Sequence, residues 1–374
     1  MYSRLLQKQI QVSLFQGFVI VLYGARQVGK TTLINQLLAE NKDKTQAIFS
    51  GDDIDIREKL KPTNFEKLIS QTGTPDILII DEAQRVENIG LTLKILHDNR
   101  PQMQIIATGS SSFDLANQIN EPLTGRSLEF VLYPLSILEV AANGIEMNRA
   151  KEKFMLYGSY PNIYSSTGNL TQKLLKNLTN QYLYKDILQF ETIQKPQAIH
   201  NLLKLLAYQV GNEVSLQELA NKLDLNKRTV AKYIDLLEKN FIVFSLTSFS
   251  KNQRKEIGKS TKIYFYDLGV RNQLIENFSE LKFRNDLGAL WENFCILERR
   301  KYLEYNQISV NSYFWRNYQQ QEIDYIEEKD GILNCYEFKW NDRKKAKLPN
   351  SFKEAYPDHT FKVINQENWL EMLG

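Results

Sequence analysis

The sequence predicts an α/β protein that joins a core built on a parallel sheet to a helical region, a winged helix and an α/β C-terminal domain. Apolar strands alternate with amphipathic stretches through residues 1–130, which is the pattern of a parallel sheet wound with helices. The strand signal is lost over residues 136–200 and returns in the last third of the chain. These changes predict four domains, at residues 1–130, 131–204, 205–260 and 261–374.

A glycine-rich loop opens the predicted core. Residues 24–31 read Gly-Ala-Arg-Gln-Val-Gly-Lys-Thr and fit the pattern GxxxxGK[ST]. An apolar strand precedes the loop and a helix follows it, so backbone N–H groups at the helix N-terminus can face a triphosphate. We expect Lys30 to reach the β- and γ-phosphates and the Thr31 hydroxyl to bind Mg²⁺. The expected ATP-binding residues are Gly24, Ala25, Arg26, Gln27, Val28, Gly29, Lys30, Thr31 and Thr32.

A second apolar strand, residues 76–80, ends in two adjacent carboxylates. The first, Asp81, can hold the Mg²⁺ ion that bridges the β- and γ-phosphates. The second, Glu82, is placed to polarise the attacking water and is the candidate general base. A strand that ends in two acids is by itself as often a solvated strand end as a site. Because this pair follows a phosphate-binding loop along the chain, it indicates a hydrolytic site.

A third strand, residues 103–107, leads into a run of small hydroxyl side chains. The C-terminal ends of parallel strands lie beside the nucleotide crevice of such a sheet. Thr108 or Ser110 is therefore a candidate for sensing the γ-phosphate or orienting water. The alternative is that these hydroxyls simply cap the N-terminus of a helix.

Composition restricts the remaining classes. The chain has 374 residues, 43% hydrophobic and 24% charged, with a net charge of +3, which is too small to demand a nucleic-acid partner. No apolar run is long enough to span a membrane, and the N-terminus lacks an apolar signal segment, so we expect a cytoplasmic protein without a membrane partner. The two cysteines are expected to be buried and unbridged, and the three histidines have no zinc-site spacing.

The middle of the chain predicts a winged helix. A capping box at Ser215 opens a helix over residues 216–223, Asn226 can cap a second helix over residues 227–238, and a strand follows at residues 241–244. Residues 213–240 carry five acids and five bases, so the module is not basic overall. Contact with DNA and a purely structural or regulatory role both stay open. The candidate nucleic-acid contacts are Asn226, Lys227, Arg228, Thr229 and Lys232.

Three strands in the C-terminal third carry a nuclease-like pattern. Asp324 lies in one strand, and Glu337 and Lys339 lie two residues apart in the next, so the last two share a face of that strand. The two acids could hold a divalent metal ion, and Lys339 could stabilise charge that develops on a phosphate. Glu292, on the preceding helix, is a candidate extra acid. The alternative is a solvated or internally paired strand face.

Ten short motifs occur in order along almost the whole chain: Gly24–Thr31, Asp81–Gln84, Thr108–Ser111, Leu123–Arg126, Tyr133–Ser136, Tyr157–Pro161, Lys262–Gly269, Phe314–Arg316, Glu322–Asp324 and Glu337–Lys339. Together they resemble the AAA-type P-loop ATPases that carry the C-terminal domain of unknown function DUF4143. The resemblance implies a RecA-like core, a helical region, a winged helix and a C-terminal domain with the restriction-endonuclease-like PD-(D/E)XK fold. It also implies that Arg126 is an arginine finger or sensor, although it could instead be an ordinary surface arginine.

These observations predict an ATP-hydrolysing switch or motor, with ATP and Mg²⁺ as cofactors, that acts on a nucleic acid or on a partner bound to one. DNA is a candidate partner, and a homo-oligomer is a candidate assembly. One alternative is an ATP-gated, metal-dependent nuclease with a live site at Asp324, Glu337 and Lys339. Another is a nucleotide-dependent winged-helix regulator in which the nuclease-like domain is an inert scaffold.

Overall fold

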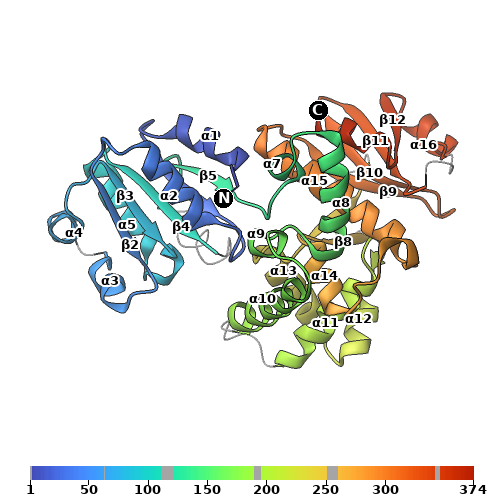
Figure 1. Cartoon of the computed structure of the whole chain (residues 1–374), viewed down its shortest axis with the longest axis horizontal. Coiled ribbons are helices and arrows are strands. Elements are labelled where there is room, and N and C mark those ends of the chain that lie inside the picture. The colour runs from blue at the N-terminus through green and yellow to red at the C-terminus, as the bar shows by residue number, and fades with distance from the viewer. Residues whose placement is uncertain are drawn as a thin grey trace. The chain divides into compact units, whose positions relative to one another are not determined.

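The structure is a computed structural model, and it describes residues 2–62, 64–110, 119, 122–188, 195–250, 260–341 and 346–374. For residues 181–188 and 196 it describes the backbone alone. The chain divides into two compact units (Figure 1). The first comprises Met1–Leu135 with Lys239–Phe241, and the second comprises Ser136–Glu238 with Ile242–Gly374. The four-domain division stays a prediction.

The first unit is built on a five-stranded sheet in the order β2-β3-β4-β1-β5, in which every neighbouring pair is parallel. The expected parallel sheet is thus confirmed. The three inner strands are almost wholly buried, as their continuous apolar runs require. The elements are α1 (Leu5–Ser13), β1 (Val19–Tyr23), α2 (Lys30–Glu40), β2 (Gln46–Ser50), α3 (Ile54–Lys59), α4 (Phe65–Thr72), β3 (Ile77–Asp81), η1 (Ala83–Arg85), α5 (Ile89–Asn99), β4 (Gln104–Gly109) and β5 (Ser127–Val131).

The second unit begins with the expected helical region and continues into a mixed sheet. Its helices are α7 (Ile137–Val140), α8 (Gly144–Tyr157), α9 (Pro161–Tyr164), α10 (Asn169–Leu188), α11 (Pro196–Tyr208), α12 (Leu216–Leu223), α13 (Lys227–Lys239), α14 (Leu268–Leu274), α15 (Leu287–Tyr305) and α16 (Asn350–Ala355), with 3₁₀ turns η3 (Leu281–Phe283) and η4 (Trp369–Leu373). Its strands are β6 (Glu213–Val214), β7 (Val243–Ser248), β8 (Thr261–Phe265), β9 (Asn311–Arg316), β10 (Glu322–Lys329), β11 (Ile332–Phe338) and β12 (His359–Ile364). Among the described residues, no helix is both long and apolar enough to cross a bilayer.

All seven strands form one sheet in the order β12-β11-β10-β9-β7-β8-β6. β7 and β8 pair antiparallel, as do β8 and β6, and Thr247 and Ser248 of β7 pair in parallel with Tyr313 and Phe314 of β9. The expected domain boundary at residue 260 therefore falls between two adjacent, paired strands. Beyond it, β9, β10 and β11 are antiparallel and β12 is parallel to β11.

The two predicted capping residues of the middle segment begin their helices as expected. The Ser215 hydroxyl accepts a hydrogen bond from the backbone N–H of Glu218 at 3.3 Å, at the start of α12. The amide oxygen of Asn226 accepts one from the backbone N–H of Thr229 at 2.7 Å, at the start of α13. These bonds satisfy N–H groups that have no partner within the helix, so the two short helices begin at defined residues.

A buried carboxylate joins two of the sequence motifs in the second unit. Asp267 caps α14 through the N–H of Val270 at 2.9 Å and also accepts the N–H of Ser159 at 2.7 Å. Gly158 has a φ of +80°, and a Cβ there would collide with the Asp267 carboxylate. Burial raises the pKa of Asp267 to about 6, even though these N–H groups and the Lys301 charge act in the opposite direction. The glycine is thus required by the close approach of an acid.

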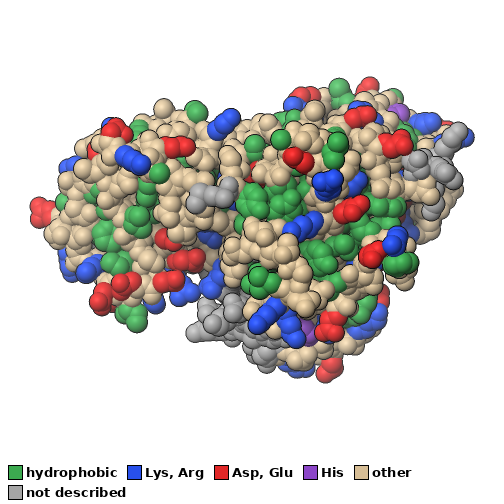
Figure 2. All heavy atoms as spheres, viewed as in Figure 1, with side chains coloured by type: hydrophobic (Ala, Val, Ile, Leu, Met, Phe, Trp, Pro, Cys, Tyr) green, Lys and Arg blue, Asp and Glu red, His purple; other side chains and the backbone are tan. Residues whose placement is uncertain are grey.

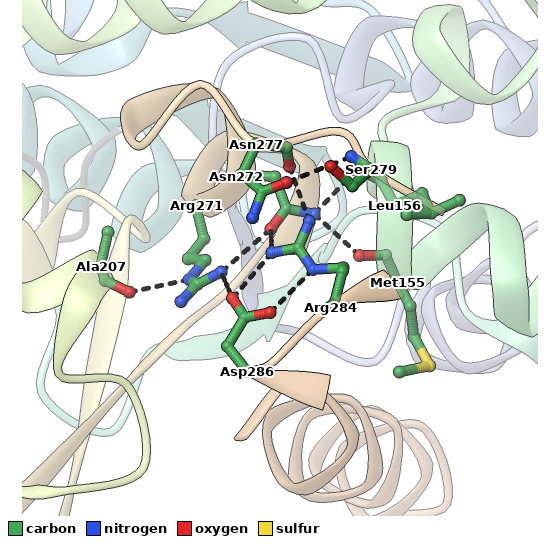
Figure 3. A network of polar contacts seen from close by, with 9 residues as sticks. All are labelled: Met155, Leu156, Ala207, Arg271, Asn272, Asn277, Ser279, Arg284 and Asp286. Carbon is green, nitrogen blue, oxygen red and sulfur yellow. Dashed lines mark hydrogen bonds and ion pairs between the residues drawn. The ribbon is translucent and has the colours of Figure 1, made fainter. Parts of the chain in front are cut away.

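A second buried polar network ties α8, α11 and α14 together (Figure 3). The guanidinium groups of Arg271 and Arg284 share the Asp286 carboxylate. Arg271 also donates to the carbonyl of Ala207 at 2.8 Å, and Asn272 donates to the carbonyl of Met155 at 2.9 Å. Buried charge of this kind is tolerated because every arginine bond is directed at an acceptor.

Candidate functional site

The glycine-rich loop leaves the end of β1 at Gly24, which has a φ of +155°. A Cβ at this position would collide with the carbonyl oxygen of Leu132, so only glycine fits. Gly29, also left-handed, directly precedes α2, which begins at Lys30. The loop therefore runs from a buried strand to a helix N-terminus, and it can direct backbone N–H groups at an anion.

The Lys30 side chain folds back over this loop and is almost fully buried. Its ammonium group donates to the carbonyl oxygens of Gly24, at 2.7 Å, and Ala25, at 3.1 Å. The charge therefore lies inside the curve of the loop. This is where a lysine must be in order to reach the phosphates of a bound nucleotide.

Because β1, β4 and β3 are adjacent and parallel, their C-terminal ends lie together beside the loop and the start of α2. The Asp81 carboxylate accepts hydrogen bonds from the Thr31 hydroxyl, at 3.3 Å, and from the Thr108 hydroxyl. Thr31 and Asp81, the two predicted Mg²⁺ ligands, are thus in contact. Both present oxygen atoms, the ligand type that Mg²⁺ prefers, and Mg²⁺ usually takes only one or two protein ligands beside phosphates and water. The residues present fit the ion.

Glu82 begins a separate group of contacts at the end of β3. Its φ of 49° is left-handed, and its N–H is directed at the Asp81 carboxylate and the Thr108 hydroxyl, at 3.2 and 3.3 Å. Its carboxylate accepts from the Gln84 amide at 2.6 Å and from the Ser110 hydroxyl at 3.3 Å. Thr108 thus contacts the predicted metal ligand, whereas Ser110 contacts the predicted base. The chain that would decide the helix-capping alternative, from Ser111 to residue 118, lies outside the described residues.

Two contacts at this site were not predicted from the sequence. Gln84 follows the acidic pair but was not assigned a role. Arg4, before α1, is buried and donates to the carbonyl oxygens of Val28 in the loop and of Tyr133, both at 2.6 Å. The Arg4 side chain thus links the loop to the segment that follows β5.

Arg126 lies at the N-terminal ends of the strands, whereas the loop lies at their C-terminal ends. Arg126 directly precedes β5, which is parallel to β1, so that Ser127 is opposite Val19 and Val131 is opposite Tyr23. The four residue steps from one end of β5 to the other separate these two ends of the sheet by roughly 13 Å, at the usual rise of a strand. The Arg126 guanidinium instead pairs with Asp98 at 2.7 Å and is about one-third exposed. It does not reach the phosphate loop of its own chain.

The candidate nucleic-acid face lies at the start of α13. Lys227, Arg228 and Lys232 are exposed. Asn226 and Thr229 are engaged with each other, because the Asn226 amide oxygen also accepts the Thr229 hydroxyl at 3.0 Å. Three cations are therefore free of the helix cap, and two of the five predicted contact residues form the cap itself.

The C-terminal pattern is brought together on β10 and β11. Asp324 is buried and accepts the backbone N–H of Phe338 at 2.8 Å. Glu337 accepts the Lys339 ammonium at 2.6 Å. Burial raises the pKa of Asp324, and burial followed by repulsion from Asp324 raises the pKa of Glu337, while Lys339 opposes both shifts.

A further lysine joins this cluster from β8. The Lys262 ammonium is 1% exposed and bonds to Glu292 at 3.0 Å and to Glu322. The Tyr264 hydroxyl donates to the same Glu292 oxygen at 2.6 Å. Burial and the nearby Asp324 raise the pKa of Glu292 to about 7, against the effect of Lys262. The sequence predicts Glu292 as an extra acid, but nothing in it connects Glu292 with Lys262.

The carboxylates of this pattern are paired within the protein. Across the described ranges, no group of three or more His, Cys, Asp or Glu side chains is placed to hold one. Each carboxylate of the pattern already has a partner within the protein: Lys262 for Glu292, Lys339 for Glu337 and a backbone N–H for Asp324. The predicted metal site at Asp324 and Glu337 stays a prediction.

Three known proteins are similar to this chain over most of its length. An uncharacterized protein of Mycobacterium tuberculosis is 28% identical over 337 residues, which cover 88% of this chain and 72% of the relative. An uncharacterized protein of Methanocaldococcus jannaschii is 26% identical over 389 residues, covering 97% and 84%. The solved Walker-type ATPase of Pyrococcus abyssi is similar in fold, with a TM-score of 0.50 and 16% identity over 74% of this chain and 96% of that one.

Three family models match the sequence in succession: an AAA domain over residues 16–141, a domain of unknown function (DUF8612) over residues 148–281, and a second domain of unknown function (DUF4143) over residues 287–370. The first match contains the phosphate loop and the strand ends described above, and the last contains Asp324, Glu337 and Lys339. The resemblance seen in the short motifs is thereby confirmed for these two domains. The chain thus contains an AAA domain followed, after the DUF8612 match, by a C-terminal DUF4143 domain.

Proposed function

We propose that the first unit binds ATP with Mg²⁺ and hydrolyses it. The observation that carries this proposal is the contact of Thr31 with Asp81 beside a loop that already holds the Lys30 ammonium. One hydroxyl, one carboxylate and one buried cation are the side chains that a nucleotide–metal complex needs from such a loop. When bound, Mg²⁺ would neutralise charge on the β- and γ-phosphates.

Glu82 acts as the general base in this proposal. Its carboxylate is held by Gln84 and Ser110, which fix its orientation without neutralising its charge, because an amide and a hydroxyl are both neutral donors. Thr108 holds Asp81 in turn, so residues at the end of β4 orient both the metal ligand and the base. A base that is oriented before the substrate arrives loses little freedom when the reaction occurs.

Arg126 completes the site of a neighbouring copy. Its distance from its own phosphate loop excludes a role in its own site, whereas its exposed position at the far edge of the sheet suits a residue presented to another subunit. This reading requires the Asp98 pair to exchange for a phosphate contact, and an exposed pair costs little to break. The functional unit is then a homo-oligomer.

The target we propose is a nucleic acid, or a partner bound to one, contacted through a winged helix. The order α11, β6, α12, α13, β7, β8 supports a winged helix, as does the antiparallel pairing of β8 with β6 and β7. The cations of the α13 N-terminus are exposed, as phosphate contacts must be. Over the visible face as a whole, Lys and Arg are interspersed with Asp and Glu among the described residues, which favours a local contact over a broad basic surface (Figure 2).

The test is ATP hydrolysis by the full chain in Mg²⁺, measured alone and with single- or double-stranded DNA. We expect hydrolysis that Glu82→Gln abolishes and that DNA stimulates in a salt-dependent way. Lys227→Ala/Arg228→Ala should lose the stimulation and keep the basal rate, whereas the exposed Lys173→Ala, on α10, is the matched control. Hydrolysis that no DNA changes would leave the ATPase proposal standing and overturn the proposed target.

A further inference from the structure

The acidic cluster of the second unit contains its own cation. The cluster consists of four carboxylates: Glu292 of α15, Glu322 and Asp324 of β10, and Glu337 of β11. The side chain of Lys262 reaches it from β8. We propose that the Lys262 ammonium is the resident cation of this cluster and takes the place that the D…ExK pattern would give to a divalent metal ion. This inference does not depend on the proposed ATPase.

Lys262 is fixed in place on both sides. In the sheet it is opposite Leu246 of β7 and opposite Glu213 of β6, so its backbone is held by two neighbouring strands. Its side chain passes over the Phe314 ring, with the ammonium 5.4 Å from the ring centroid, and is 1% exposed. The paired backbone and the ring contact together hold the ammonium beside the carboxylates.

The Lys262 ammonium also stabilises the negative charge of the cluster. It bonds to Glu292 and Glu322, and its charge is the largest single influence that favours the ionised form of Asp324. In the opposite direction, the three carboxylates outweigh the effect of burial and raise the pKa of Lys262 above that of an ordinary lysine, so the side chain stays charged. Arg316 adds a second cation within 3.6 Å of Glu322.

A divalent ion would have to displace these contacts. Mg²⁺ requires several oxygen atoms at about 2.0–2.1 Å in near-octahedral order. Glu292 is bonded to Lys262 and Glu337 to Lys339, and the buried Lys262 ammonium would repel an incoming ion. The pattern of acids and lysine is therefore satisfied within the protein, and no nuclease reaction is expected from it.

The experiment measures Mn²⁺ binding to the full chain without nucleotide, by loss of the free Mn²⁺ EPR signal. All proteins carry Asp81→Asn, so that the phosphate-loop site does not contribute. We expect this parent to have no Mn²⁺ site that Asp324→Asn removes. Adding Lys262→Met should create one, with a dissociation constant at least ~10-fold lower than any site of the parent, and Asp324→Asn should abolish it again.

The control is Lys282→Met, an exposed lysine on η3, which should leave Mn²⁺ binding unchanged. An Asp324-dependent Mn²⁺ site in the parent would overturn the proposal, and this result does not require the Lys262 variant to fold. A folded Lys262→Met protein that binds no Mn²⁺ would overturn it as well, because the ammonium would then not be what occupies the place of the ion.

Discussion

The two carboxylate clusters of this chain differ in the partners that hold them. At the phosphate loop, Asp81 is held by the hydroxyls of Thr31 and Thr108. In the C-terminal domain, Glu292 and Glu337 are held by the ammonium groups of Lys262 and Lys339. A hydroxyl orients a carboxylate and leaves its charge uncompensated, whereas an ammonium group both orients and neutralises it.

The carboxylate at the phosphate loop can therefore still bind a cation, whereas those of the C-terminal cluster already have a cationic partner. Motifs of acids and lysines look alike in a sequence, because the letters do not say whether the lysine faces a ligand or the acids. The decisive feature is therefore the charge of each acid's nearest partner. The predictions below exploit this contrast, starting from the largest expected effect.

The first comparison removes one lysine from each region. Lys30→Ala should abolish tight ATP binding, since several charge-assisted hydrogen bonds to phosphate are lost. Lys262→Met should leave ATP binding unchanged and lower thermal stability, because it leaves buried carboxylates uncompensated. Calorimetric titration with ATP and thermal unfolding of both variants measure the two effects. ATP binding by Lys30→Ala at the affinity of the wild type would show that the loop is wrongly assigned.

The second prediction concerns the cation at the far edge of the first sheet. Arg126→Ala should lower ATP turnover by ~10³-fold or more if it supplies an arginine finger to a neighbouring copy. Mixing Arg126→Ala with Lys30→Ala should restore part of the activity, because each chain provides what the other lacks. Activity per chain should also rise with protein concentration, and the exposed Arg149→Ala serves as control. Turnover that is independent of concentration, with no rescue on mixing, excludes this role.

The third prediction tests the base. Glu82→Gln should retain ATP and turn over at least ~10²-fold slower, the usual scale for loss of a general base. Ser110→Ala should have a smaller effect in the same direction, since it removes only one contact that orients Glu82. Single-turnover hydrolysis measures both, with the exposed Glu87→Gln as the matched control. A Glu82→Gln enzyme with unaltered turnover would move the base elsewhere.

The last prediction is a pH dependence of stability from Asp267, a carboxylate held mainly by backbone N–H groups. Its pKa of about 6 lies above the 3.8 of an unperturbed aspartate, so between these values the native state keeps a proton that the unfolded chain has released. The free energy of unfolding should therefore fall as the pH rises through this window, by on the order of 3 kcal/mol. Urea unfolding from pH 4 to 7 should show a shallower fall for Asp267→Asn, with the exposed Asp43→Asn as control. Equal slopes in wild type and Asp267→Asn would refute the shifted pKa.

Much of the first site could be predicted from the sequence because its parts are local. The loop, its strand and its helix are contiguous, and parallel strands bring their C-terminal ends to one edge, so that Thr31, Asp81, Glu82, Thr108 and Ser110 had to converge. Arg4 could not be predicted. It lies outside every motif, and it reaches the loop only because α1 packs on the same unit.

The C-terminal cluster was predicted only in part, since its pairing is not local. Asp324 and Glu337 lie on consecutive antiparallel strands, which a sequence can suggest. Lys262 reaches them because β7 pairs with β9 and β8 pairs with β7, a strand order that no periodicity indicates. Because of the same pairing, the strands before and after residue 260 belong to one sheet.

The continuity of the seven-stranded sheet has a practical consequence for anyone who divides this chain. Truncation at residue 260 would leave β7 without its partner β8 in one fragment and β9 without its partner β7 in the other. Each fragment would expose a row of unpaired N–H and C=O groups along an apolar strand, which is the usual template for aggregation. The helices of the middle segment and the DUF4143 strands are therefore expected to fold and to be expressed in soluble form only when they are kept together.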